Sequence, residues 1–309
     1  MTEERKRDRL LELVKAGQKT LPPGYELKSK SRFTVGDLSY TVCVCFVDLT
    51  VIVSGVNLHS YSESDTLVKY SEARYSPVSS KPADYIRLAT SSYYRNLETG
   101  ENSELIADSL ESAHREALDW RNENIAWLET LKKNLATSLS ASINNVKVET
   151  TQACDDFWMY CASIDPDLHY YRSKQIESLS SSYDFMTKIA EPSKFAEQLG
   201  CDVGKQIELQ RDFKVDWPIE ALVASKLGVN DYFISVYHGP VFYLNAGEKQ
   251  KLIQRYELGS RNIIPFVKSE EYREQQEYRF LVRVSGYSPN EDLFYLKVSD
   301  ELRNLMSPI

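Results

Sequence analysis

The stretch FVKSEEYREQQEYRFLVRV, residues 266–284, decides how the rest of the chain is interpreted. A dense polar turn leads directly into a run rich in aromatic and β-branched residues, which is typical of a buried strand. Gln275 and Glu277 lie two positions apart at the junction, and positions two apart share a face in an extended chain. We therefore predict that both side chains point into one site, where the amide orients a substrate and the carboxylate stabilises a developing positive charge. The alternative is an exposed, charge-rich turn ahead of a buried strand.

Short strands and helices are predicted on both sides of this stretch. Strands are expected at 38–53, 66–75, 84–90, 156–164, 232–237 and 241–244, and helices at 2–16, 192–200, 219–227 and 247–256. His238-Gly239-Pro240 has an ordinary turn composition and is predicted to separate two strands. The pattern predicts an α+β fold with a mixed β-sheet core and flanking helices.

Residues 103–140 contain neither Gly nor Pro and are predicted to form one long helix, a helical insertion about 55 Å long. Leu110, Ala117, Asn124 and Leu131 are spaced seven apart along it, which favours a homodimer or a larger complex with this helix as a main contact. Packing of the helix on its own domain is the alternative. The expected organisation is an N-terminal part of the core over 1–100, an insertion over 101–145 and a C-terminal part of the core over 146–309.

Composition excludes several classes of protein. The net charge of −8 and the pI of about 5.3 do not indicate binding to a nucleic-acid backbone. Five cysteines lack the spacing of a zinc site and four histidines are scattered, so no metal is expected. The longest apolar run, 42–53, is too short for a membrane span, and the first 17 residues have no signal-peptide core. We expect a cytoplasmic, thiol-reduced protein.

Other candidate positions come from hydroxyl and basic side chains. Thr90-Ser91-Ser92-Tyr93 follows a predicted strand, and its hydroxyls either cap a helix or bond ligand phosphate and ribose oxygens. Ser163 ends another strand and either has the same use or braces a catalytic carboxylate. The chain has no phosphate-binding Gly-rich loop and no Gly-x-Ser-x-Gly elbow, which argues against nucleotide triphosphate binding and serine hydrolysis.

Gln275-Gln276-Glu277 and the strand after it resemble the Gln-x-Glu turn of ADP-ribosyltransferases. The resemblance implies a split sheet and NAD as cofactor. It implies that Glu277 stabilises the oxocarbenium-like transition state, that Gln275 orients the acceptor and that Ser163 positions Glu277 or a ribose. It further implies cofactor contacts from Ser91 and Tyr93. The family also uses a basic residue on an early strand for this purpose, and Arg74 or Arg87 is the candidate for it.

A second resemblance covers residues 156–283 and is carried by the Trp158–Ser163 strand and the Phe-x-Lys…Gln-x-Glu-Tyr-Arg-Phe ending. It points to a bacterial domain family connected with phage defence. Two hypotheses follow. The first is a non-catalytic binding or regulatory module, which would be a subunit or sensor of a defence system. The second is an NAD-consuming enzyme that uses Glu277. An open cleft around Glu277, facing hydroxyls and an arginine, favours the enzyme, whereas an ion pair with Arg279 or Arg273 on a convex surface favours the module.

Overall fold

The computed structural model of the chain describes residues 24–36, 38–49, 66–96, 113–119, 147–153, 157–165, 183–209, 231–245, 248, 264–284 and 291–309. The chain divides into two compact units, one made of residues 1–112 and 154–309 and the other of residues 113–153.

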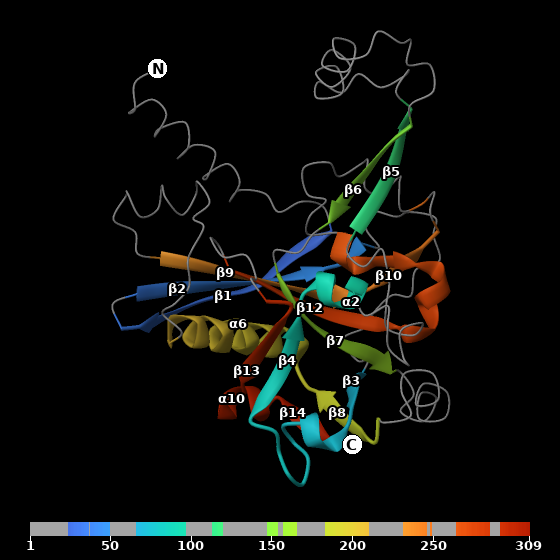
Figure 1. Cartoon of the computed structure of the whole chain (residues 1–309). Coiled ribbons are helices and arrows are strands. Elements are labelled where there is room, and N and C mark those ends of the chain that lie inside the picture. The colour runs from blue at the N-terminus through green and yellow to red at the C-terminus, as the bar shows by residue number, and fades with distance from the viewer. Residues whose placement is uncertain are drawn as a thin grey trace, which may run out of the picture. The chain divides into compact units, whose positions relative to one another are not determined.

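The first unit is built on a ten-stranded sheet (Figure 1). Its strands are β1 (Tyr25–Val35), β2 (Leu38–Val47), β3 (Thr66–Ser71), β4 (Tyr85–Ala89), β7 (Trp158–Asp165), β8 (Phe185–Ile189), β9 (Asp231–Pro240), β12 (Glu277–Val284), β13 (Leu293–Lys297) and β14 (Met306–Pro308). The main path through it runs β1-β2-β9-β12-β7-β3-β8-β14. β2 and β9 are parallel and the other pairs of this sheet are antiparallel, so the sheet is mixed and, with its helices, α+β.

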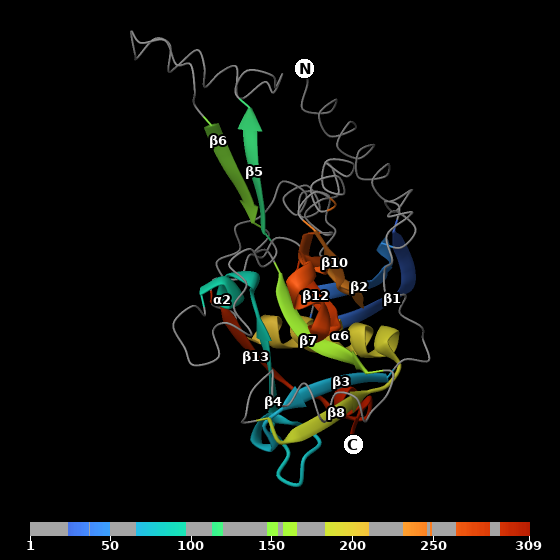
Figure 2. The same cartoon turned by 90° about the vertical axis from the view of Figure 1, so that its right-hand side faces the viewer.

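The sheet divides at β7. One edge of β7 pairs with β12 from Trp158 to Ser163. Its other edge pairs with β3 from Ser163 to Asp165 and with β4 at Met159. β3 continues to β8 and β14, whereas β4 continues to β13, so two branches leave the same strand in different directions (Figure 2). We call the region where they separate the fork.

The main helix, α6 (Pro192–Leu209), packs against β2 and β9 of the sheet, and its apolar side chains enter the larger core cluster. Phe195, Leu199 and Val203 are completely buried there, together with Val42 and Val236 of the sheet. Full burial of an apolar side chain of this size contributes about 1.5–3 kcal/mol, so the apolar face of α6 is a large part of what holds the helix to the sheet.

Gly200 does not end this helix. The sequence predicts a helix over 192–200, whereas α6 continues nine residues further, to Leu209. A Cβ placed on Gly200 would lie 2.8 Å from side-chain atoms of Val42 and Val236. The glycine is required because the helix approaches the sheet closely, and this contact outweighs the low helix propensity of glycine.

A smaller layer covers part of the sheet around β12. It contains β10 (Phe242–Leu244) paired in parallel with β11 (Val267–Ser269), and the short 3-10 helices η3 (Ile264–Phe266) and η4 (Glu270–Gln275). Its apolar side chains form a second core cluster with Met159 of β7 and Leu281 of β12. The remaining short helices of the described residues are η2 (Ala73–Tyr75), α2 (Ser91–Asn96) and α10 (Asp300–Arg303).

The second unit contains β5 (Ala113–Asp119) and β6 (Lys147–Ala153), which pair antiparallel over seven residues each. The prediction of one continuous helix over 103–140 is therefore wrong at residues 113–119. Pairing with a distant segment outweighs the helix-favouring composition of this run. The rest of the predicted helix lies outside the described residues. The prediction of a homodimer or complex through it stays a prediction, and its heptad argument does not hold across β5.

The predicted turn at His238-Gly239-Pro240 is also wrong, because β9 extends through all three residues. His238 is 1% exposed and bonds through Nδ1 to the Tyr278 hydroxyl at 2.7 Å. A Cβ on Gly239 would lie 2.3 Å from the carbonyl oxygen of Val47, so only glycine fits this close approach of backbones. Pro240 is the last residue of the strand, a position at which proline is tolerated.

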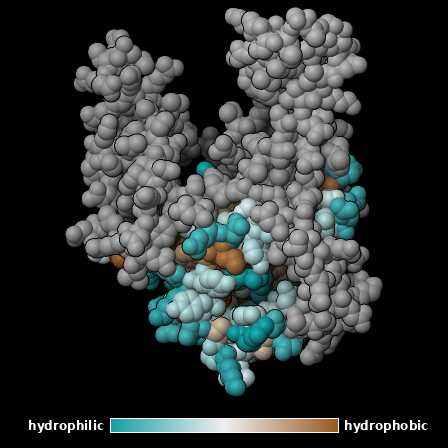
Figure 3. All heavy atoms as spheres, in the orientation of Figure 1, coloured by the Kyte–Doolittle hydropathy of each residue, from teal (hydrophilic) through white to brown (hydrophobic). Residues whose placement is uncertain are grey.

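The other predicted strands at 38–53, 66–75 and 84–90 contain β2, β3 and β4, respectively, and the one predicted at 156–164 covers β7 except for its last residue, Asp165. The helices predicted at 2–16 and 219–227 lie outside the described residues, as does nearly all of the one predicted at 247–256. On the face shown in Figure 3, the described residues are mainly hydrophilic, with small apolar areas between them. Within the described part of the chain, no helix has both the length and the apolar character needed to cross a membrane.

Candidate functional site

The turn that joins η4 to β12 brings Gln275 and Glu277 together. Gln276, between them, has left-handed backbone angles of φ 41° and ψ 49°, and its N–H donates to the Arg273 carbonyl at 3.2 Å. The two side chains therefore converge because a left-handed residue reverses the chain, and not because they alternate along one strand, as the sequence argument assumed. Left-handed geometry is uncommon for a residue other than glycine.

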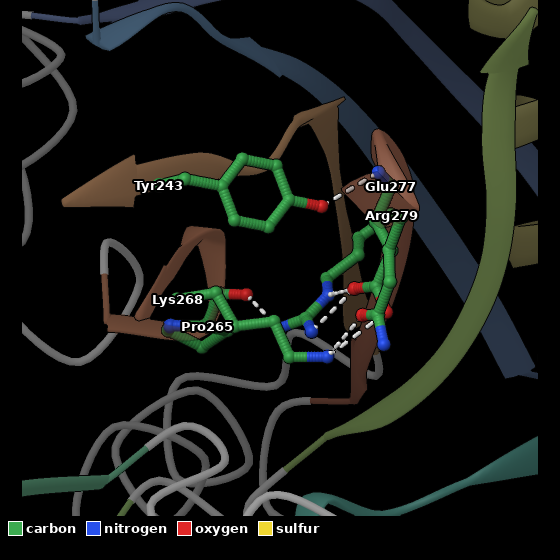
Figure 4. Close-up of polar contacts among 6 residues, drawn as sticks. Tyr243, Pro265, Lys268, Glu277 and Arg279 are labelled. Carbon is green, nitrogen blue, oxygen red and sulfur yellow. Dashed lines mark hydrogen bonds and ion pairs between the residues drawn. The ribbon is translucent and has the colours of Figure 1, made fainter. Parts of the chain in front are cut away.

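The carboxylate of Glu277 is bound through both oxygens (Figure 4). Lys268 of β11 donates to Oε1 at 3.1 Å and also to Oε1 of Gln275 at 2.7 Å. Arg279 donates to Oε2 of Glu277 from Nε at 2.8 Å and from Nη2 at 2.5 Å, and its Nη1 donates to the Pro265 carbonyl. Gln275, Lys268, Glu277 and Arg279 form one polar network, which we call the Glu277 corner.

Burial and charge act in opposite directions on Glu277. Its side chain is 17% exposed, whereas those of Lys268 and Arg279 are 3% and 1% exposed. Burial by itself would raise the pKa of Glu277, but Arg279 and Lys268 outweigh it and lower the pKa from 4.5 to about 2. The carboxylate is therefore ionised at neutral pH, and the three charged groups carry a net positive charge.

Hydrogen bonds to the backbone of Glu277 tie the corner to its neighbours. The N–H of Glu277 donates to the Tyr243 hydroxyl at 2.8 Å, and the carbonyl of Glu277 accepts from Val241 at 2.9 Å. Ser163 of β7 lies directly opposite Glu277 in the strand register and is 8% exposed. The structure thus brings together the three predicted catalytic residues, Gln275, Glu277 and Ser163.

The hydroxyl side chains that follow β4 lie at the N-terminus of α2, and one of them caps this helix. Thr90 Oγ1 accepts from the N–H of Tyr93 at 3.3 Å, which is the geometry of a helix N-cap. Thr90 also donates to Asp292 at 2.9 Å, and Ser92 donates to the same carboxylate oxygen. Ser91 is completely buried. Of the two uses considered for these hydroxyls, the structure shows capping.

The two candidate arginines have different surroundings. Arg87 of β4 lies over the ring of Tyr93 at 5.4 Å and donates to its hydroxyl at 3.5 Å. Arg74 is bound to Glu72 at 2.8 Å and is 69% exposed. Arg87 is therefore the arginine that meets another candidate binding residue, Tyr93.

Lys268 takes part in the site without having been singled out from the sequence, and Lys69 is a second lysine that the sequence analysis did not name. Lys268 is almost completely buried and bonds both residues of the Gln-x-Glu turn. Lys69 of β3 lies over the ring of Tyr160 at 5.3 Å, and the charge of Glu277 contributes to its pKa. The signal for Lys268 was its place between Val267 and the polar turn, where a lone charge follows two apolar residues. Lys69, within the run TLVKYS, gave a weaker signal of the same kind.

Metal ligands are not gathered at any one place in the described residues, where no group of three or more His, Cys, Asp or Glu side chains could hold an ion. Burial raises the pKa of the Cys43 thiol, and it raises those of Cys45 and Cys201 to about 11. These three thiols are therefore protonated at neutral pH and are poor nucleophiles.

Comparison of the chain with protein-family models, with curated proteins and with solved structures finds no match. The relationship to ADP-ribosyltransferases and to a defence-associated family therefore stays a prediction from the sequence.

Proposed function

We propose that this chain is a non-catalytic binding or regulatory module in which Glu277 has a structural role. The observation that carries the proposal is the pairing of both carboxylate oxygens of Glu277 with Lys268 and Arg279. A carboxylate stabilises a developing sugar cation only if its negative charge is directed at that cation. In the Glu277 corner, two cations surround one carboxylate, so the local field opposes a further positive charge.

The low pKa of Glu277 supports the same conclusion. A general base acts best when its pKa lies near the working pH, and a carboxylate with a pKa of about 2 is a weak base at neutral pH. The buried cysteines with raised pKa values do not supply a nucleophile in its place.

Incubation of the purified full-length chain with NAD tests this proposal, with free nicotinamide measured by chromatography and label transfer measured in a cell extract. We expect neither to exceed the buffer blank, for the wild type and for Glu277→Gln alike. Glu270→Gln is the matched control, because Glu270 is 56% exposed and paired with Arg273 in the adjoining 3-10 helix. Nicotinamide release by the wild type that Glu277→Gln abolishes and Glu270→Gln preserves would overturn the proposal.

The second candidate is an NAD-consuming enzyme resembling ADP-ribosyltransferases. It is favoured by the convergence of Gln275 and Glu277 on Lys268 and by the position of Ser163 opposite Glu277. For this candidate, a ligand must displace Lys268 or Arg279 from the carboxylate before the reaction. The same assay distinguishes it, since Gln275→Ala would then lower label transfer to an acceptor more than it lowers release of nicotinamide.

A role in bacterial defence rests on the sequence resemblance over residues 156–283. It is tested by challenging cells that carry the wild-type gene or a deletion with phage, and equal plaque counts would contradict it.

A further inference from the structure

The branch of the sheet made by β4 and β13 has one buried face and one exposed face (Figure 1). The residues of the buried face enter the larger core cluster: Ile86, Leu88, Phe294 and Leu296. The residues that alternate with them are all exposed: Tyr85, Arg87, Tyr295 and Lys297. Because side chains alternate along a strand, these four lie on one side of the strand pair, which we call the β4–β13 face.

The strand register arranges the β4–β13 face in a regular pattern. Tyr295 lies directly opposite Arg87, and Lys297 lies directly opposite Tyr85. Each pair sets an aromatic ring beside a positive charge, and the two tyrosines are diagonal neighbours. Tyr85 is 50% exposed and Tyr295 is 56% exposed. Single exposed apolar side chains are ordinary, whereas adjoining ones form a patch that indicates an interaction surface.

The outer edge of β13 is already occupied. Gln206 of α6 donates from Nε2 to the Tyr295 carbonyl at 2.7 Å and accepts from the Lys297 N–H at 2.7 Å. These backbone groups are the ones that a further strand would need in order to pair with β13 at this point. A partner of this branch therefore meets the exposed face and does not extend the sheet.

Charges of both signs surround the tyrosines. Besides Arg87 and Lys297, exposed carboxylates flank the face at both ends, Asp84 directly before β4 and Glu291 two residues before β13. The phosphates of a nucleic acid would be repelled by these carboxylates, so the mixed pattern favours a protein partner that also carries both signs. Tyrosine and arginine are enriched in protein interfaces.

We infer that two copies of this chain associate through their β4–β13 faces, related by a two-fold axis. An axis midway between positions 291 and 297 makes the two β13 strands antiparallel across the interface. It places Lys297 over the partner's Glu291 and Tyr295 over the partner's Leu293. Symmetry forms each of these contacts twice, so one face supplies both members of every pair.

The same axis keeps like charges apart. Arg87 lies opposite Tyr295 and Ala89 lies opposite Leu293 in the strand register, so Arg87 meets the partner's Ala89 and not the partner's Arg87. The inference goes beyond the proposed function, because it concerns assembly and does not depend on a ligand or on NAD. It also uses a surface separate from the predicted helix over 103–140.

Sedimentation velocity of the full-length chain, from low to high micromolar concentration, tests the inference. We expect a reversible monomer–dimer equilibrium that Tyr295→Ala weakens at least about tenfold, because tyrosines at the centre of an interface carry much of its binding energy. Leu27→Ala is the matched control. Leu27 is 49% exposed on β1, at the opposite end of the main path through the sheet, and its removal should leave the affinity unchanged.

A charge exchange tests the two-fold arrangement. Lys297→Glu and Glu291→Lys should each weaken the dimer, since each sets like charges against one another across the interface. The double variant restores opposite charges and should restore the affinity. A merely structural role of either residue does not predict this rescue, and circular dichroism checks that each variant is folded.

A wild type that stays monomeric at all concentrations would overturn the inference. So would a dimer that Tyr295→Ala leaves intact, one that Leu27→Ala weakens equally, or a double charge variant no tighter than the single ones. Fluorescence anisotropy with a labelled single-stranded DNA covers the other occupant: binding that Tyr295→Ala abolishes would assign the face to nucleic acid instead. NAD turnover by an intact dimer would remove only the proposed function.

Discussion

Glu277 and His238 lie on neighbouring strands of one sheet, and burial has opposite results for them. Glu277 faces Lys268 and Arg279, so it stays ionised with a pKa lowered to about 2. His238 faces two neutral hydroxyls, those of Tyr278 at 2.7 Å and Ser193 at 3.4 Å. Burial and, to a smaller extent, the charge of Lys28 together lower its pKa from 6.5 to about 3. The comparison shows that the partner, and not burial alone, decides which groups of this sheet are charged.

Removal of the guanidinium from the Glu277 corner is expected to have the largest effect. Arg279→Met leaves the Glu277 carboxylate buried with only Lys268 to compensate it, which should lower the free energy of unfolding by about 3–5 kcal/mol. Urea denaturation followed by circular dichroism measures this. Arg74→Met is the control, because Arg74 is 69% exposed, and it should leave the free energy of unfolding nearly unchanged.

The double variant Glu277→Gln with Arg279→Met sharpens this test. The double variant removes the carboxylate charge that Arg279→Met leaves without its guanidinium partner. It should therefore recover part of the lost free energy of unfolding. A double variant that is less stable than Arg279→Met would show that the charge of Glu277 stabilises the fold by another route.

Acid is expected to act on His238 before it acts on Glu277. The folded protein holds His238 neutral, whereas the unfolded chain takes up a proton below pH 6.5, so stability is lost as the pH falls from 6.5 towards 3. The slope approaches about 1.4 kcal/mol per pH unit, or roughly 3 kcal/mol by pH 4. Glu277 contributes stability above pH 4.5 that is lost as the pH falls towards 2.

Unfolding free energies of the wild type and of His238→Gln, measured from pH 7 to pH 4, separate the two groups. The variant should lose most of the slope between pH 6.5 and pH 4.5, because glutamine keeps a polar group near Tyr278 and does not titrate. An unchanged slope in the variant would assign the acid sensitivity to other groups.

The smallest expected effect concerns the turn that forms the Glu277 corner. Left-handed geometry at Gln276 costs about 1–2 kcal/mol for a residue with a Cβ, whereas glycine loses about 0.5–1 kcal/mol more chain entropy on folding. Gln276→Gly should therefore raise the free energy of unfolding by roughly 0.5 kcal/mol. Gln275→Gly is the contrasting variant: it removes the acceptor that binds Lys268 at 2.7 Å and should destabilise the protein. Destabilisation by Gln276→Gly in thermal melts would contradict the strain argument.

Local pattern was enough to predict the strands around the candidate site and the start of α6. β7 and β12 are dense in aromatic and β-branched residues, and these favour a strand whatever the partner. The convergence of Gln275 and Glu277 was also predicted, although for a reason that the structure replaces with the left-handed turn at Gln276. The predicted Arg87 and Tyr93 meet, and the hydroxyl of Thr90 caps a helix.

Sequence by itself determined the composition of the strands, the junction of turn and strand at Glu277, and the acidic net charge. Tertiary structure alone decided the fork at β7, the strand at 113–119, and the passage of β9 through His238-Gly239-Pro240. The physical reason is that strand pairing and the close backbone approach at Gly239 depend on segments that are distant along the chain, and local propensity does not report on them. The partners of Glu277 are near it in sequence, and the ion pair with Arg279 was one of the alternatives considered, whereas the bond from Lys268 was found only in the structure.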